Sequence, residues 1–154
     1  MSLWEVDLYP LEGQPDLLAR RVTAEAATLG LGKVDVQAAR GFLIQSGAHS
    51  PELKQADIDK IVRELLCDAV VERAVVGRPA DAALRKAPAG HEQLVHVLPK
   101  PGVMDPVAQS VLSAIADLGL KADAVRTMTK YWFAPLAEEA LKLLKAKVLS
   151  NDAI

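Results

Sequence analysis

The chain has 154 residues, a formal net charge of −2, and hydrophobic and charged fractions of 51% and 25%. These values are typical of a globular protein with one domain or two small ones, and they give no electrostatic support to nucleic-acid binding. A single cysteine excludes both an intrachain disulfide and a cysteine-cluster metal site.

The first half of the chain alternates predicted strands and helices. In chain order they are a strand over residues 3–9, a helix over 17–29, a strand over 34–44, a helix opened by Ser50 and Pro51, and a strand over 70–76. Alternation places Trp4, Val6 and Leu8 on one face of the first strand. Asp16 stands at the N-cap position of the first helix, and Gly30 is the glycine expected after its C-terminus.

Residues 77–92 interrupt this pattern. The segment is rich in proline, alanine and other small residues, which predicts a linker with some extended character. A short helix over residues 80–86 is the alternative, because alanine and leucine favour helices.

The second half begins again with a strand. Its predicted elements are a strand over residues 94–98, a turn over 99–102, a helix capped by Asp105 and started by Pro106, a long strand within 120–133, and a helix opened by Pro135. Aspartate at the N-cap and proline at the first helical position both favour a helix start. The order of elements in the first half therefore recurs.

Identical residues in the two halves are separated by a constant step, for example 102 − 13 = 89 and 119 − 30 = 89. The first-half members are Val6, Pro10, Gly13, Asp16, Ala19, Val22, Leu29, Gly30, Leu31 and Val36. Such a repeat predicts an α+β fold of two layers, built from tandem units that form an intrachain pseudo-dimer. Each unit is expected to run strand–helix–strand–helix–strand. The predicted units are residues 1–76 and 93–154, with 77–92 as the linker.

The helix ends of the two halves correspond at a smaller step. Residues 65–71 match residues 148–154, since 154 − 71 = 83. Nothing after Ile154 corresponds to residues 72–76, so the last strand of the second unit is expected to be missing. The chain is then expected to be part of a longer polypeptide, or to have its final strand supplied differently. The unpaired edge that this leaves is expected to favour a homodimer.

The second unit carries the more specific motif. Its residues are Lys100-Pro101-Gly102-Val103-Met104-Asp105-Pro106, then Leu118-Gly119, Val125-Arg126 and Lys130. In these residues the chain resembles the PurS family, the small subunit of phosphoribosylformylglycinamidine synthase. That family shows a Lys-x-Gly-Val-x-Asp-Pro turn, a helix ending in Leu-Gly, and a Val-Arg-x-Gly-Lys strand. The resemblance covers nearly all of residues 94–154.

The sequence departs from the family pattern in two places. Arg126 and Lys130 are one residue further apart than in the family and have no glycine between them. The first unit, residues 3–76, resembles the family more loosely: no proline follows Asp16, and Gln37 stands where the arginine would be.

The resemblance implies a function for the whole complex. A tandem PurS-like arrangement is similar to the N-terminal region of long, fused forms of the synthetase. The enzyme converts formylglycinamide ribonucleotide to the amidine in purine biosynthesis, using ATP and glutamine-derived ammonia. A PurS-like domain is implied to be non-catalytic and to bridge the synthetase and glutaminase parts. No cofactor is expected in this fragment.

Four residues are candidates for partner contact. Lys100, Arg126 and Lys130 could form a basic patch, although exposed charges often contribute little and a solvated surface is the alternative. Alternation directs Trp132 to the face opposite its neighbours Tyr131 and Phe133, and tryptophan is common at interfaces. Core packing on both faces of that strand is the alternative.

No catalytic or metal-binding residue is predicted. Cys67 has no activating cluster beside it, which favours a buried, inert thiol. The three histidines, His49, His91 and His96, lack the spacing of metal ligands. The sequence contains neither a Gly-x-x-x-x-Gly-Lys nucleotide loop nor a Gly-x-Ser-x-Gly motif.

Two other functional classes stay open. Duplicated two-layer units also serve as regulatory domains that bind a small molecule between the copies, and a free-standing small enzyme is the third and weakest candidate. The N-terminus runs directly into a strand pattern instead of a signal peptide, and no apolar run is long enough to cross a membrane. A cytoplasmic location is therefore expected.

Overall fold

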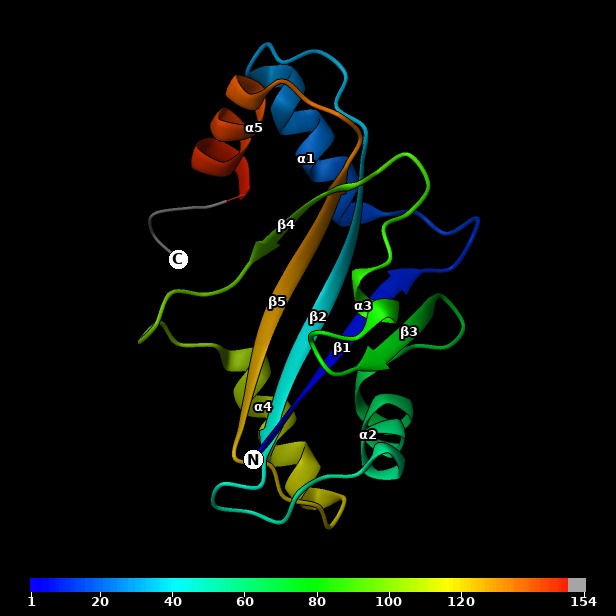
Figure 1. The fold of residues 1–154 in the computed structure, drawn as a ribbon, viewed down its shortest axis with the longest axis vertical. Coiled ribbons are helices and arrows are strands. Elements are labelled where there is room, and N and C mark those ends of the chain that lie inside the picture. Colours follow the sequence, from blue (N-terminus) through cyan, green and yellow to red (C-terminus); the bar gives the residue numbers. More distant parts are fainter. Residues whose placement is uncertain (150–154) are drawn as a thin grey trace.

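A five-stranded antiparallel sheet forms the centre of the computed structural model, which describes residues 1–149 (Figure 1). The strand order is β3-β1-β2-β5-β4. The strands are β1 (Ser2–Pro10), β2 (Val36–Ser46), β3 (Glu72–Gly77), β4 (Gln93–Val97) and β5 (Ala124–Phe133). The predicted α+β class is confirmed.

The helices follow the strands in the expected order. They are α1 (Leu17–Thr28), α2 (Gln55–Ile61), α3 (Ala82–Arg85), α4 (Pro106–Asp117) and α5 (Glu138–Leu144). Two of them, α2 and α5, continue into π-helical turns, η1 (Val62–Leu66) and η2 (Lys145–Leu149).

One face of the sheet is covered by α1, α2, α4 and α5, which lie as two groups at opposite ends of the sheet (Figure 1). Trp4, Val6 and Leu8 point to this face as predicted, and they pack against α2, η1 and α4. At the other end, Phe133 and Tyr131 of β5 pack against α1, α5 and η2. Alternating apolar side chains therefore give the sheet one helix-covered face.

The opposite face, called here the outer face, is covered in part by residues 78–92. This segment, which we call the strap, contains α3 and crosses the sheet between β3 and β4 (Figure 1). Leu84 of α3 is 2% exposed. The short helix considered as an alternative is therefore present, within an otherwise irregular segment.

An aspartate ties the first long helix to the neighbouring strand. Asp16 Oδ1 accepts a hydrogen bond from the backbone N–H of Ala19 at 3.0 Å, so the predicted N-cap is confirmed. Its other oxygen, Oδ2, accepts from the N–H of Ala38 in β2 at 2.9 Å. Each carboxylate oxygen thus has a separate backbone donor, one in the helix and one in the sheet.

The second long helix begins in the same way. Asp105 Oδ1 accepts from the N–H of Ala108 at 3.1 Å, and Oδ2 accepts from the N–H of Thr127 in β5 at 3.0 Å. These three residues lie 89 positions after Asp16, Ala19 and Ala38, since 105 − 16, 108 − 19 and 127 − 38 all equal 89. The geometry of this corner therefore recurs at the step of the sequence repeat.

The two π-helical turns also correspond. η1 and η2 begin 83 residues apart and end 83 residues apart, since 145 − 62 = 83 and 149 − 66 = 83. This is the step predicted for the helix ends. The rest of the predicted match, residues 150–154, lies outside the described residues.

Two predicted helix starts were wrong. Ser50 and Pro51 were expected to open the second helix, but α2 begins at Gln55, where the Asp57 carboxylate accepts from the N–H of Lys54 at 2.9 Å. The Ser50 hydroxyl instead lies 3.5 Å from the N–H of Gly47 and helps to close the preceding loop.

Pro135 was likewise expected to open the last helix, yet α5 begins at Glu138. The N–H of Leu136 donates to the side-chain Oε1 of Gln93 at 3.2 Å, which ties this stretch to β4 before the helix starts. The first helix start is therefore set by a local cap at Lys54 and Asp57, and the second is preceded by a contact with a residue distant in sequence.

Candidate functional site

A cluster of charged side chains is buried between the outer face and the strap. Lys130 Nζ on β5 donates to Glu5 Oε2 at 2.8 Å and to Asp7 Oδ2 at 2.6 Å, both on β1. It also donates to the backbone carbonyl of Leu84 in the strap at 2.7 Å. One ammonium group therefore joins the first strand, the fifth strand and the strap.

This cluster has an unequal number of charges. The side chains of Lys130, Glu5 and Asp7 are 2%, 4% and 1% exposed, and Asp7 Oδ1 has no hydrogen-bond partner among residues 1–149. Burial raises the pKa of Asp7 to about 7; the ammonium of Lys130 opposes this rise and Glu5 adds to it. Burial by itself would lower the pKa of Lys130, but the two carboxylates raise it above its usual value. The cluster therefore exchanges a proton near neutral pH while the lysine stays charged.

An aromatic pair lies beside the cluster on the same face. Trp132 Nε1 donates to the hydroxyl of Tyr9 at 2.9 Å, and both side chains are buried. The Arg73 guanidinium lies over the Tyr9 ring, 4.5 Å from its centroid. Burial raises the pKa of Tyr9 above its usual value. The partners of Trp132 are thus inside the chain.

The far end of the strap is fixed by a histidine. His91 Nε2 lies 2.9 Å from Asp35 Oδ1, and His91 Nδ1 lies 3.0 Å from the carbonyl of Ala89. The Asp35 carboxylate is the main cause of a raised pKa at His91. This contact strengthens when the imidazole is protonated.

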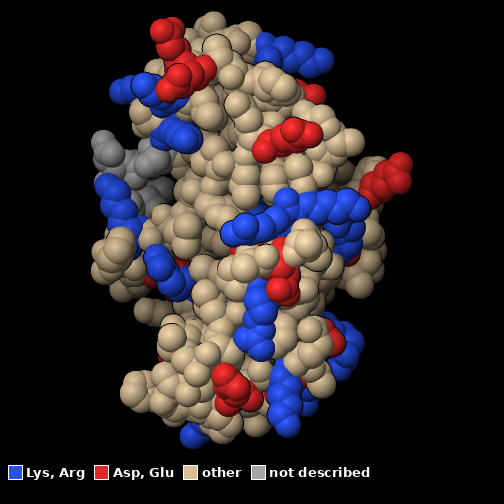
Figure 2. Space-filling model, in the orientation of Figure 1, with Lys and Arg blue, Asp and Glu red and all other residues tan. Residues whose placement is uncertain are grey.

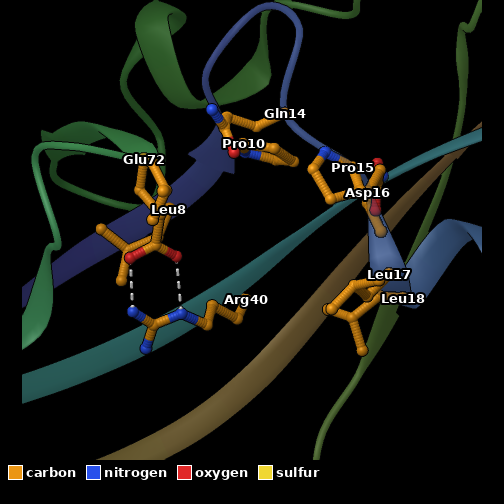
Figure 3. A pocket seen from close by; sticks show the side chains of 11 residues that line it. Leu8, Pro10, Gln14, Pro15, Asp16, Leu17, Leu18, Arg40 and Glu72 are labelled. Carbon is orange, nitrogen blue, oxygen red and sulfur yellow. Dashed lines mark hydrogen bonds and ion pairs between the residues drawn. The ribbon is translucent and has the colours of Figure 1, made fainter.

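A pocket of about 430 Å³ lies on the helix-covered face beside the Asp16 corner (Figure 3). Its walls are mostly apolar, with Leu8 and Leu18 among them. Arg40 and Glu72 form a two-pronged ion pair at 2.8 and 2.7 Å, which Figure 3 shows as two dashed lines. Arg40 also chiefly causes a lowered pKa at Glu72. The pocket therefore combines apolar walls with a paired guanidinium.

The Asp105 corner has a smaller pocket of about 280 Å³ with a more basic rim. Lys100 and Arg126 both line it and both are exposed. Arg126 Nη2 donates to the carbonyl of Pro99 at 3.0 Å, which holds the guanidinium over the turn. These two predicted partner-contact residues are therefore brought together on the surface.

The other two predicted contact residues have a different environment. Lys130 and Trp132 are each 2% exposed, so neither side chain reaches the surface of the chain in this conformation. The sequence reading also missed Glu5, Asp7 and the Arg40–Glu72 pair. Nothing local marks them, because their partners are brought close only by the register of β1, β2, β3 and β5.

Cysteine and histidine form no recognisable reactive centre in the described part of the chain. Burial raises the pKa of the Cys67 thiol, whose Sγ lies 3.7 Å from the carbonyl of Glu72. His49 and His96 are exposed, and the imidazole of His91 forms a hydrogen bond with the Asp35 carboxylate. Among residues 1–149, no group of three or more histidine, cysteine, aspartate or glutamate side chains is arranged to hold a metal ion.

No protein-family model, no curated protein and no solved structure matches the chain. None of the helices described here is both long enough and apolar enough to cross a membrane.

Proposed function

We propose that the chain is a tandem PurS-like interaction module of phosphoribosylformylglycinamidine synthase. In this role it bridges the synthetase and glutaminase parts and carries no catalytic group itself. The observation that carries the proposal is the repeated aspartate corner. The Asp105 corner lies within the Lys100–Pro106 motif, and the Asp16 corner makes the same pair of backbone contacts 89 residues earlier.

The strand order supports a duplicated module. β2 and β5 pair antiparallel at the centre of the sheet, from Val36 with Phe133 to Gln45 with Ala124. β1 flanks β2 and β4 flanks β5, and Val6 of β1 corresponds to Val95 of β4 at the step of 89. Such an arrangement resembles two copies joined at a sheet edge, which is how a homodimer of one unit would pair.

The two halves differ at their outer edges. β1 is paired on both sides, with β2 and β3, whereas β4 pairs with β5 alone among residues 1–149. Beside the open edge of β4 lies a groove of about 410 Å³, lined by residues 94–98, Lys145 and Leu149. An open edge can accept a further strand or a second copy of the chain, so the homodimer remains part of the proposal.

The Lys100–Arg126 corner is the surface that we assign to partner binding. Both cations are exposed at one pocket. The Asp105 carboxylate also lines this pocket and offsets part of their charge, which leaves two cations to one anion at its rim. Exposed cations of this kind favour association with an acidic partner surface mainly by steering and specificity.

Reconstitution of the amidine-forming reaction tests this proposal. Purified synthetase and glutaminase parts are assayed with formylglycinamide ribonucleotide and ATP, with either glutamine or free ammonia as nitrogen donor. The module is expected to raise the glutamine-dependent rate and to leave the ammonia-dependent rate nearly unchanged, because it organises the complex and not the chemistry. An equal glutamine-dependent rate with and without the module contradicts the proposal.

A matched pair of double variants locates the surface. Lys100→Glu with Arg126→Glu is expected to weaken complex formation and lower the glutamine-dependent rate. The control is Lys60→Glu with Lys121→Glu, which makes the same charge change at two exposed positions outside the Asp105 corner. Equal effects of the two double variants would show that the Lys100–Arg126 corner is not the partner surface. Such a result would not bear on the proposal that the chain bridges the two parts of the enzyme.

The apolar pocket beside Asp16 favours a second candidate, a regulatory domain that binds a small molecule. A nucleotide or amino acid that binds there would raise the melting temperature with increasing concentration. Absence of complex formation together with such a shift would favour the regulatory function over the bridging one.

A further inference from the structure

The strap is held to the rest of the molecule by packing and by contacts beside titratable groups. Leu84 is buried, Ala87 packs against the Tyr9–Trp132 pair, and the Arg78 guanidinium lies 3.9 Å from the centroid of the Trp4 ring. In the middle of the strap, the carbonyl of Leu84 accepts from Lys130 at 2.7 Å. Near its end, His91 is 2.9 Å from Asp35. Two of the contacts that close the strap therefore adjoin groups whose protonation can change.

The charges of the buried cluster at the middle of the strap balance only if one of its two carboxylates holds a proton. With Lys130, Glu5 and Asp7 all charged, one positive charge faces two negative charges in a buried site. A buried charge without a partner is strongly unfavourable, so retention of one proton by the carboxylates relieves the imbalance. Asp7 Oδ1 shows this imbalance in the structure, because this oxygen is buried and no group in the described part of the chain donates a hydrogen bond to it.

The end contact depends on pH in the same direction. Protonated His91 is a cation beside the Asp35 carboxylate, whereas neutral His91 keeps only a hydrogen bond. The stabilisation is therefore present below the usual histidine pKa and is lost as the pH rises through the raised value. The charge balance of the cluster beneath the strap and the His91–Asp35 contact at its end thus both favour the closed strap at lower pH.

Three other titratable or charged groups lie near the cluster. They are Tyr9 on β1, Arg73 on β3, whose guanidinium lies over the Tyr9 ring, and His96 on β4. On the strap itself, Asp81, Arg85 and Lys86 are exposed. Burial, and secondarily the charge of Lys130, lowers the pKa of His96, so this side chain is neutral near neutral pH and does not offset the carboxylates. Figure 2 shows basic side chains across the middle of this face, beside α3. None of these groups supplies a second buried cation at the cluster.

We infer that residues 78–92 form a proton-dependent strap, which is closed over the outer face while the Lys130 cluster holds its extra proton and opens when that proton leaves. Opening uncovers Tyr9 and Trp132, the aromatic pair beside the cluster. Trp132 is then available for the partner contact that its position in the sequence suggested. The inference does not depend on the function proposed above.

The size of the effect follows from linkage. Asp7 has a pKa of about 7 in the closed form, raised from 3.8. The closed form is therefore favoured at low pH and loses this advantage as the pH rises through about 7. From about pH 6 to about pH 8, the opening equilibrium constant is expected to rise roughly tenfold from Asp7 alone. Loss of the proton from His91 adds to this rise.

Hydrogen exchange measured by mass spectrometry tests the inference on the unmodified chain. Exchange of peptides that cover residues 78–92 is compared at about pH 6 and about pH 8, after correction for the intrinsic pH dependence of amide exchange. The strap is expected to lose roughly tenfold or more of its protection, while peptides from β2 and β5 keep theirs. Equal protection of the strap at the two pH values would overturn the inference.

Variants identify the groups responsible. Asp7→Asn imitates the protonated carboxyl group and is expected to leave only the part of the pH dependence that comes from His91. Asp7→Asn combined with His91→Gln is expected to give a strap whose protection is the same at both pH values. Asp117→Asn, at an exposed position on α4, is the matched control and should retain the wild-type behaviour. A double variant that keeps the wild-type pH dependence would also overturn the inference.

Discussion

The two faces of the sheet are stabilised in different ways. On the helix-covered face, α1, α2, α4 and α5 bury side chains such as Val6, Ile44 and Ile115, which are all 0% exposed. On the outer face, the short strap covers Lys130 and two carboxylates. Apolar burial is strong and insensitive to pH, whereas a buried charge cluster is directional and depends on protonation. The comparison indicates that packing on the helix-covered face is insensitive to pH, and that the sensitivity to pH near neutrality comes from the outer face.

The largest effect is expected from Lys130→Ala. This change leaves Glu5 and Asp7 buried without their cation, which is expected to lower the free energy of unfolding by about 3–5 kcal/mol. Urea denaturation at neutral pH measures the loss. Replacing all three residues by neutral ones, with Lys130→Met, Glu5→Gln and Asp7→Asn, should recover much of it. A loss below about 1 kcal/mol for Lys130→Ala would contradict the buried charge imbalance.

Ile115→Ala tests the helix-covered face. Truncation of this fully buried side chain on α4 is expected to cost about 3 kcal/mol, within the usual range of about 2–5 kcal/mol. The loss should be the same at pH values on either side of neutrality, because apolar packing carries no proton. Val107→Ala on the same helix is the control; this side chain is 57% exposed and its loss should be within about 0.5 kcal/mol. A strongly pH-dependent loss for Ile115→Ala would remove the distinction between the faces.

The two aspartate corners provide a test with a smaller expected effect. Asp16→Ala and Asp105→Ala are each expected to lower the free energy of unfolding by about 1–2 kcal/mol, because each removes one helix cap and one backbone bond to a strand. The loss should be larger for Asp105→Ala, which also removes the hydrogen bond from the Thr127 hydroxyl at 2.8 Å. Thermal or urea denaturation measures both losses. A larger loss for Asp16→Ala than for Asp105→Ala would argue against this account of the corners.

Asp105 also has a predicted pH dependence. Burial by itself would raise the pKa of Asp105, but hydrogen bonds from Thr127 and Ala108 outweigh burial and lower it. Asp105 therefore makes its full contribution to the free energy of unfolding at neutral pH. This contribution begins to fall as the pH drops below 3.8, the usual aspartate pKa, and is lost below the lowered pKa of Asp105.

The smallest effect is expected from Glu72→Gln in the pocket beside Asp16. The Arg40–Glu72 pair is partly exposed, so its loss should cost about 1 kcal/mol or less. Because Arg40 lowers the pKa of Glu72, the pair stabilises the fold above the usual value of 4.5 and ceases to do so as the pH falls below the lowered value. The difference in urea midpoint between wild type and variant should therefore shrink at about pH 3. An unchanged difference at low pH would exclude the ion pair as its source.

Features with local causes were predictable from the sequence. The alternation of Trp4, Val6 and Leu8, the caps at Asp16 and Asp105, and the order of strands and helices depend on residues near one another in the chain. The step of 89 also predicted that the second corner would reproduce the first. These features account for most of the helix-covered face.

The buried charges were not predictable in this way. Alternation places Glu5 and Asp7 only on the face opposite Trp4, Val6 and Leu8, and Lys130 was a candidate for a basic patch. The strand order places β1 and β5 on either side of β2, and Lys130 reaches Glu5 and Asp7 across it. The strap then returns over this face and places the carbonyl of Leu84 beside the lysine. Long-range register of this kind leaves no periodic signal in any one segment. The same reason explains why Trp132 is buried against Tyr9 instead of lying at the surface.

The central claim is that this chain bridges two parts of an amidine-forming synthase. Light scattering coupled to size exclusion measures it most directly, with the chain mixed with the purified synthetase and glutaminase parts at neutral pH. The account predicts one peak whose mass contains all three components and which loses the glutaminase part when the module is omitted. Separate elution of the chain from both parts would contradict it.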